Sequence, residues 1–180
     1  MNLEEKTVKS EEVFKGRIVE LKVDTVLLPD GRYSTREIVK HDEAVAIVAI
    51  DERRNIYLVQ QYRKPIEKVL LEIPAGIMNK GEKPLAAAKR ELEEETGFKA
   101  ERWENLGFFY TAPGFTDEKI HLFLARELIE GKVNLDEDEF VKVEVMPFKK
   151  AYDMALNGGI IDAKTIIGIQ LAKVKLGWRD

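Results

Sequence analysis

The sequence contains no cysteine, and this absence excludes both disulfide bridges and thiolate chemistry. No apolar run approaches the roughly 20 residues that a membrane-spanning helix needs, so no membrane partner is expected. There is no basic run, and the net charge is −4, which argues against binding to nucleic acid. The first residues, MNLEEKTVKSEEV, lack the apolar core of a signal peptide. A cytoplasmic location is therefore the default expectation.

The N-terminal part of the sequence predicts a small antiparallel β unit. Residues 17–28 are rich in β-branched side chains, Pro29-Asp30-Gly31-Arg32 is a turn signal, and residues 33–40 can form the returning strand. The nearly all-apolar run AVAIVAI at 44–50 predicts a strand that is buried on both faces. Further strands are expected at 56–62, 69–73, 106–110, 120–125 and 141–147.

Three helices are expected, at 84–96, 149–157 and 163–176. Pro84 suits the first turn of a helix, where its missing N–H group costs nothing. Gly97 is placed to end that helix in a left-handed conformation, and Asp162 can cap the last one. Strands before and after one central helix predict a mixed α/β order.

The predicted helix at 84–96 ends in a run of acidic residues. Carboxylates near a helix C-terminus face the negative end of the macrodipole, and Glu91 and Glu95 repel each other across one turn. Glu91, Glu94 and Glu95 share one helical face, because they are spaced i, i+3 and i+4. Clustered carboxylate oxygens suit Mg²⁺, so this face predicts a metal site. The alternative interpretation is a solvated acidic helix face.

The residues around this run decide between the two interpretations. From Gly76 to Phe98 the sequence reads G-x5-E-x7-R-E-U-x-E-E-x-G-U, where U is a bulky apolar residue. This pattern resembles the signature of the Nudix hydrolases at every fixed position. The resemblance implies an α/β (α+β) fold, the Nudix α/β/α sandwich with a mixed sheet, preceded by a small N-terminal antiparallel β extension. We place the extension at 1–42 and the Nudix domain at 43–180.

The resemblance also implies the roles of the residues in this segment. It implies metal binding by Glu91, Glu94, Glu95 and the carbonyl of Ala75, with Mg²⁺ as the cofactor and Mn²⁺ as an alternative. Glu94 and Arg90 are also expected to contribute to catalysis, with Arg90 orienting the glutamates through salt bridges. Taken alone, Arg90 would be read as a surface ion pair.

Four short segments outside this signature resemble one subfamily, the ADP-ribose pyrophosphatases. They are REIV at 36–39, QQYR at 60–63, LLEIPAG at 70–76 and APGFTDE at 112–118. An arginine suits a diphosphate, because its planar guanidinium group can donate two parallel hydrogen bonds to phosphate oxygens. The arginines can also be read as ordinary charges at strand ends, and Pro113-Gly114 as a simple turn. The substrate-binding residues that the resemblance implies are Arg36, Glu37, Arg63, Glu72, Ile77, Pro113 and Glu118.

The acidic segment LDEDEF at 135–140 is the expected source of the general base. In the subfamily, a glutamate on a mobile loop activates the attacking water. Counting back from the next strand favours Glu139, with Glu137 as the second candidate. The alternative is a solvated acidic loop.

The resemblance thus implies a Mg²⁺-dependent enzyme that hydrolyses ADP-ribose to AMP and ribose 5-phosphate. One alternative is a pyrophosphatase for another nucleoside diphosphate sugar, such as GDP-mannose or UDP-glucose. Another is a catalytically silent ADP-ribose sensor, although such regulators usually have degraded signature glutamates. The expected partners are a small nucleotide sugar and a second copy of the chain. The subfamily implies a homodimer with an exchanged N-terminal region, in which Arg36 acts on the neighbouring subunit's site.

Overall fold

The computed structural model describes residues 2–134 and 140–178 and divides the chain into two compact units. The first unit consists of Met1–Glu43 together with Phe109–Lys119. The second unit consists of Ala44–Phe108 and Ile120–Asp180.

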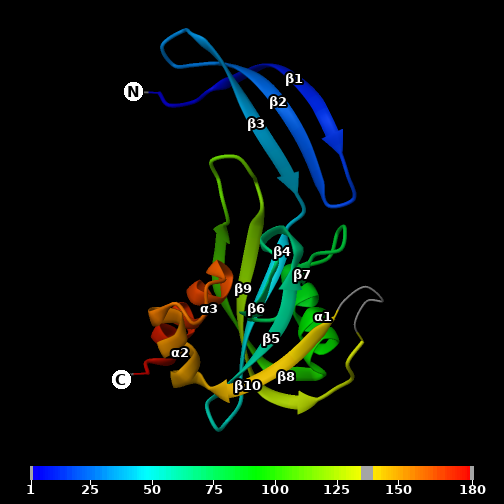
Figure 1. Ribbon diagram of the computed structural model, residues 1–180, viewed down its shortest axis with the longest axis vertical. Helices are drawn as coiled ribbons and strands as arrows, with labels where there is room; N and C mark the ends of the chain where they lie inside the picture. Colours follow the sequence, from blue (N-terminus) through cyan, green and yellow to red (C-terminus); the bar gives the residue numbers. More distant parts are fainter. Residues whose placement is uncertain (1, 135–139, 179–180) are drawn as a thin grey trace. The chain divides into compact units, whose positions relative to one another are not determined.

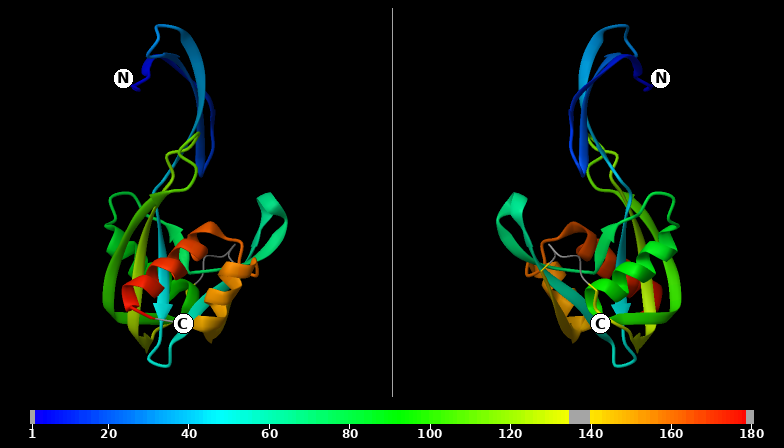
Figure 2. Two further views of the ribbon diagram at one scale, coloured as in Figure 1. Left: turned by 90° about the vertical axis from the view of Figure 1, so that its left-hand side faces the viewer. Right: turned by 90° about the vertical axis from the view of Figure 1, so that its right-hand side faces the viewer.

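The first unit contains a three-stranded antiparallel sheet in the order β1-β2-β3 (Figures 1 and 2). The predicted hairpin is confirmed: Leu27 lies opposite Tyr33, and Gly31 adopts a φ of +87° in the turn. The Gly31 N–H donates to the Leu28 carbonyl at 2.9 Å, which closes this turn. The first strand was not predicted from the sequence. The strands are β1 (Lys6–Lys15), β2 (Val19–Leu27) and β3 (Tyr33–His41).

The second unit is built on a mixed sheet in the order β10-β5-β4-β9-β8, with β6 on β5 and β7 on β4. Strands β4 and β9 run parallel, whereas β4 pairs antiparallel with β5 and β7. A short 3-10 helix, Lys64–Ile66, connects β5 to β6. The strands are β4 (Ala44–Ile50), β5 (Asn55–Arg63), β6 (Lys68–Glu72), β7 (Ala75–Ile77), β8 (Phe98–Tyr110), β9 (Lys119–Glu130) and β10 (Val141–Pro147).

The helices are α1 (Pro84–Thr96), α2 (Phe148–Asn157) and α3 (Ala163–Leu176). Helix α1 ends at Gly97 with a φ of +74°, and α3 begins where the Asp162 carboxylate accepts from the Thr165 N–H at 3.0 Å. Both caps agree with the sequence prediction. Within 2–134 and 140–178, no helix has the length and apolar character needed to span a bilayer.

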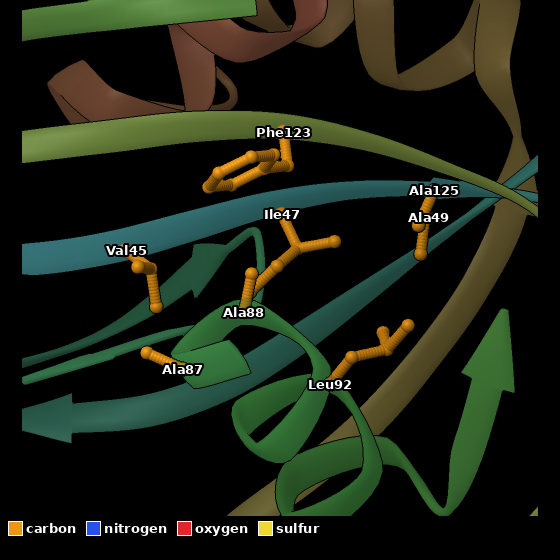
Figure 3. Packing of buried hydrophobic residues seen from close by; sticks show 8 residues of the cluster. All are labelled: Val45, Ile47, Ala49, Ala87, Ala88, Leu92, Phe123 and Ala125. Atoms are coloured by element: carbon orange, nitrogen blue, oxygen red, sulfur yellow. The ribbon is translucent and has the colours of Figure 1, made fainter. Parts of the chain in front are cut away.

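Strand β4 forms the centre of the second unit, and all seven of its residues are buried. Val45 and Ile47 pack toward α1, where they meet Ala88 and Leu92 (Figure 3). The opposite face lies against α3, because a Cβ atom at Gly168 would come within 2.9 Å of Val48. Helix α1 thus covers one face of the sheet, and α2 and α3 lie on the other (Figure 1). The predicted mixed sheet between helical layers is confirmed.

Candidate functional site

Strand β7, which precedes α1, passes unusually close to an acidic side chain of that helix. Gly76 lies in β7, opposite Val45 of β4. A Cβ atom at Gly76 would lie 2.1 Å from the carboxyl carbon of Glu91, so only glycine fits without displacing that group. The sheet pairing therefore holds the backbone of β7 against the helix face that carries the glutamates.

Arg90 is the centre of an ion-pair cluster on this face. Its Nη1 donates to Glu91 Oε1 at 2.6 Å and to Glu94 Oε2 at 2.9 Å. Its Nη2 donates to Glu82 Oε2 at 3.0 Å and to the carbonyl of Ile77 at 3.1 Å. One guanidinium thus joins three signature glutamates and the loop that precedes the helix.

The charges in this cluster stabilise one another. The hydrogen bond to Glu82 makes the largest contribution to raising the pKa of Arg90, burial opposes it, and Glu91 and Glu94 add to it. The hydrogen bond from Arg90 likewise lowers the pKa of Glu82. Because one cation faces three carboxylates, negative charge remains in excess on this helix face.

Two of the glutamates on this face are well shielded from solvent. Glu91 and Glu95 are 8% and 3% exposed, and Glu95 Oε2 accepts from the Ala75 N–H at 3.0 Å. Glu95 therefore holds Ala75 in place, and the carbonyl of Ala75 is expected to bind the metal. The oxygen donors and the excess negative charge suit a hard cation such as Mg²⁺.

The carboxylates do not form a preassembled metal cage. Among the described residues, no three acidic or histidine side chains converge in a geometry that would hold an ion. The glutamates instead bind Arg90 and the Ala75 N–H group. The donors are carboxylate and carbonyl oxygens, which are hard ligands, so the donor set fits a hard cation such as Mg²⁺ that keeps part of its water shell.

A second charged cluster lies where β5, β6 and α3 meet. Arg63 holds Glu72 with two parallel bonds, Nε to Oε1 at 2.7 Å and Nη2 to Oε2 at 2.6 Å. Glu72 is only 1% exposed, and it also accepts from Lys164. Lys164 is paired in turn with Asp162 at 3.1 Å. Sequence reasoning missed Lys164, because no pattern connects it to a glutamate 92 residues away.

The two clusters are electrostatically linked. Burial alone would raise the pKa of Glu72, but the Arg63 hydrogen bond and the Lys164 charge outweigh burial and lower it. The hydrogen bond from Glu72 is the main cause that raises the pKa of Arg63, and the charge of Glu95 adds to it. The second unit therefore combines an acidic helix face with a buried carboxylate, Glu72, that is flanked by the cations Arg63 and Lys164.

The remaining predicted substrate residues lie in the first unit, with the exception of Ile77. Arg36 binds Glu5 through Nη2 at 2.5 Å, and Glu37 lies opposite Val23. Glu118 accepts from the Thr111 hydroxyl at 2.6 Å and lies 3.6 Å from His41. Pro113 occupies a tight turn, because the Ala112 carbonyl accepts from Phe115 and Thr116. Ile77 lies in the second unit and is 41% exposed.

Both candidates for the general base, Glu137 and Glu139, lie outside the described residues. The segment just before them is bound to the end of α1. The Asn134 N–H donates to the Glu94 carbonyl at 3.2 Å, and the Gly131 N–H donates to the Gly97 carbonyl at 2.7 Å. Residue 134 therefore lies next to the helix end that carries Glu94 and Glu95.

Comparison with known protein families gives two matches that together span most of the chain. Residues 40–166 match the family described as NUDIX domain. Residues 5–39 match the family described as nucleoside diphosphate sugar hydrolase N-terminal domain.

Individual proteins are similar over nearly the whole length. A Bacillus subtilis protein named ADP-ribose pyrophosphatase is 47% identical over 97% of this chain and 95% of its own length. A Bacillus methanolicus protein named methanol dehydrogenase activator is 49% identical over 96% of this chain and 94% of its own. A crystal structure titled ADP compounds hydrolase aligns with a TM-score of 0.89, at 24% identity, over 98% of this chain and 97% of that one.

Proposed function

The chain belongs to the NUDIX domain family, and from this premise we propose that it is a Mg²⁺-dependent ADP-ribose pyrophosphatase yielding AMP and ribose 5-phosphate. The observation that carries the proposal is the acidic face of α1, where Arg90 gathers Glu82, Glu91 and Glu94. Support for the substrate comes from the similarity to the Bacillus subtilis protein of that name.

In this proposal Glu91, Glu94, Glu95 and the Ala75 carbonyl hold the cation. A bound Mg²⁺ supplies polarisation of a phosphoryl oxygen and a lower pKa for a bound water. Arg90 orients the carboxylates, and the Ala75 N–H keeps one oxygen of Glu95 in place. Glu139 accepts the proton of the attacking water, with Glu137 as the second candidate.

Substrate recognition is assigned to residues outside the acidic face of α1. Glu72 orients the Arg63 guanidinium through Nε and Nη2, and the remaining N–H groups of that guanidinium suit the oxygens of a diphosphate. Lys164 adds a second cation beside the same carboxylate. The remaining substrate contacts are assigned to Arg36, Glu37, Ile77, Pro113 and Glu118.

We extend the proposal to a homodimer with exchanged N-terminal sheets, in which Arg36 serves the neighbouring subunit. The first unit exposes apolar side chains that a second subunit could cover: Val8, Val13, Phe14 and Ile18 are each more than half exposed. A small sheet of this kind is marginal by itself and needs a packing partner. Light scattering that shows only monomer at working concentration would contradict the exchange.

A substrate panel tests the proposed reaction. ADP-ribose, GDP-mannose and UDP-glucose are compared by kcat/KM, with Mg²⁺ and with a chelator. Mg²⁺-dependent turnover that favours ADP-ribose is expected. Preference for another nucleotide sugar would reassign the substrate, and binding of ADP-ribose without turnover would indicate a sensor.

Substitution of Glu95 tests the metal assignment. Glu95→Gln keeps an oxygen that can accept from the Ala75 N–H but removes the negative charge, so turnover should fall steeply while the fold persists. Glu101→Gln, at an exposed position of β8, is the matched control and should leave turnover unchanged. Wild-type kcat in Glu95→Gln would remove Glu95 from the metal site.

Paired substitutions test the choice of base. Glu139→Gln should slow the chemical step without weakening Mg²⁺ binding, whereas Glu137→Gln should have the smaller effect. A larger loss of kcat in Glu137→Gln would transfer the role to that residue.

A second candidate function follows from the Bacillus methanolicus relative, which is named for activation of methanol dehydrogenase. Adding the purified chain to methanol dehydrogenase tests it directly. If Glu95→Gln activates the dehydrogenase as well as the unaltered chain does, activation does not depend on the hydrolytic site.

A further inference from the structure

The second unit has a hollow of about 220 Å³ between the β4–β5 hairpin, the start of α2 and the end of α3. We name it the aromatic hollow and define it by Arg53, Arg54, Phe148, Tyr152, Lys173 and Trp178. None of these residues belongs to the signature helix or to the Arg63–Glu72 cluster. The hollow is therefore a separate feature of the molecule.

Three aromatic rings form the apolar part of the hollow. Phe148 packs edge-on against Trp178, with ring centroids 4.9 Å apart. The Arg54 guanidinium lies 4.9 Å from the Trp178 ring centre, and the Lys173 ammonium lies 3.8 Å from the Tyr152 ring centre. Two cations are thus held beside ring faces by cation–π attraction.

The charge of the lining has one sign. Arg53 and Lys149 also line the hollow, so it is bordered by four cations, and no described aspartate or glutamate lines it. Lys149 pairs with Asp153 at 3.1 Å. Both members of that pair are exposed, so the pairing is weak and leaves the cation available.

The backbone holds this arrangement in place. Arg54 adopts a φ of +61°, a left-handed conformation that costs a residue with a side chain about 1–3 kcal/mol. The Arg54 carbonyl accepts from the Phe148 N–H at 2.9 Å, which ties the hairpin to the start of α2. The hairpin is therefore fixed in the conformation that places Arg54 beside Trp178.

Flat apolar rings inside a cationic rim suit a ligand with a planar ring and a concentrated negative charge. A volume of about 220 Å³ is below the roughly 300–1,000 Å³ of sites that enclose drug-sized ligands, so the hollow can enclose only part of a mononucleotide and is too small for a dinucleotide. Four cations are more than are needed to balance the single charge of a carboxylate. A phosphate monoester, which carries about −1.5 to −2 charges near pH 7, matches this rim better.

We propose that the aromatic hollow is a binding site for a nucleoside monophosphate, with the base against the rings and the phosphate against the cationic rim. This site is independent of hydrolysis, so a measurement of binding can test it whether or not the proposed reaction is correct.

Trp178 provides a local probe, because Trp103 is the only other tryptophan. Trp103 packs against Phe123 in the core and donates its indole N–H to the Ala100 carbonyl. AMP is titrated into Trp103→Phe, whose fluorescence comes from Trp178 alone. The same titration of Trp178→Phe is the blank. If Trp103→Phe does not fold, the difference between the unaltered chain and Trp178→Phe gives the same signal.

A saturable response of Trp178 to AMP is expected, and it should weaken as the salt concentration rises. Lys173→Met should weaken AMP binding by about tenfold, the usual effect of losing one charged contact. Lys175→Met is the matched control, since it removes a charge from the same helix outside the hollow, and it should bind AMP normally.

Two results would overturn the site. One is the absence of a saturable Trp178 response at millimolar AMP. The other is an equal response to adenosine or to inorganic phosphate alone, since either would show that the ring and the charge are not recognised together.

Discussion

Gly76 allows strand β7 to approach the glutamates of α1, and replacing it with alanine tests that geometry. The added Cβ would lie 2.1 Å from the carboxyl carbon of Glu91 and 2.2 and 2.3 Å from its two oxygens. An ordinary contact begins at 3.4 Å, so the carboxyl group or the loop must move by at least about 1.3 Å, the difference between 3.4 and 2.1 Å. Glu91 would then leave the position in which Arg90 holds it at 2.6 Å.

The expected effect on activity is larger than the effect on stability. A misplacement of about 1 Å in a positioned catalytic group can cost roughly a hundredfold in rate. The steric conflict itself should cost about 1–3 kcal/mol of unfolding free energy, as overpacking generally does. We therefore expect Gly76→Ala to remain folded and to lose about two orders of magnitude in kcat for ADP-ribose.

The matched control is the same substitution at Gly168 on α3. There the new Cβ would lie 2.9 Å from Ile73 and Val48, so it crowds the core and not the glutamates. Gly168→Ala should lose a similar amount of unfolding free energy in urea but keep kcat per folded molecule. If Gly76→Ala kept wild-type kcat, or if both variants lost kcat equally, the close approach of Gly76 to Glu91 would have no special role in catalysis.

Three further predictions concern charge and stability. Glu72→Gln should cost about 3–5 kcal/mol at pH 7, because it leaves Arg63 and Lys164 without their buried carboxylate. Since the folded pKa of Glu72 is lowered, its contribution is complete above its unfolded value of about 4.3 and disappears as the pH falls through the folded value. The difference between wild type and Glu72→Gln in urea unfolding should therefore shrink below about pH 4, and a constant difference would contradict the ion pairs. Asp162→Ala should cost about 1 kcal/mol through loss of the cap on α3, whereas Asp153→Ala, at an exposed position of α2, should change thermal unfolding little. Mg²⁺ at about one hundred times its Kd should add about 2.7 kcal/mol of stability, and an undiminished gain in Glu95→Gln would argue against binding at this face.

The parts of the fold that the sequence predicts well are those with local signals. Helix α1 is bounded by Pro84 and Gly97, and the predicted limits of 84–96 agree with the structure. The AVAIVAI segment predicts strand β4 equally directly, because a run of apolar residues alone is expected to be buried. The α/β fold class and the NUDIX family are confirmed for the same reason: their signals lie within short, continuous segments.

Two of the missed segments, β1 and the first half of β8, have polar sequences that neighbouring strands hold in place, and the three-residue strand β7 was too short to be predicted. Strand β1 reads KTVKSEEVFK and is exposed along its length, so it forms because β2 offers backbone partners and not because of its own pattern. The first half of β8, from Phe98 to Asn105, is missed for a similar reason.

The residues of the candidate site also fall into two groups, those that the local sequence predicts and those that it does not. The glutamates of α1 and Arg90 lie within six consecutive residues, so helical spacing alone predicts their shared face. The contact between Glu72 and Lys164 depends on how α3 packs across the sheet, which no local pattern encodes. The roles of Glu137 and Glu139 stay predictions, since both lie outside the described residues.

The burial of β4 on both faces has a consequence for how this protein can diversify. Val45 and Ile47 support the helix that carries the glutamates, while Val48 supports the helix that carries Lys164. Substitutions on opposite faces of the strand that are far apart and share no contact should have nearly additive effects. Under the proposed function, a substitution that faces α3 would change the surroundings of Lys164 and leave the packing of the glutamate-bearing helix α1 to the other face.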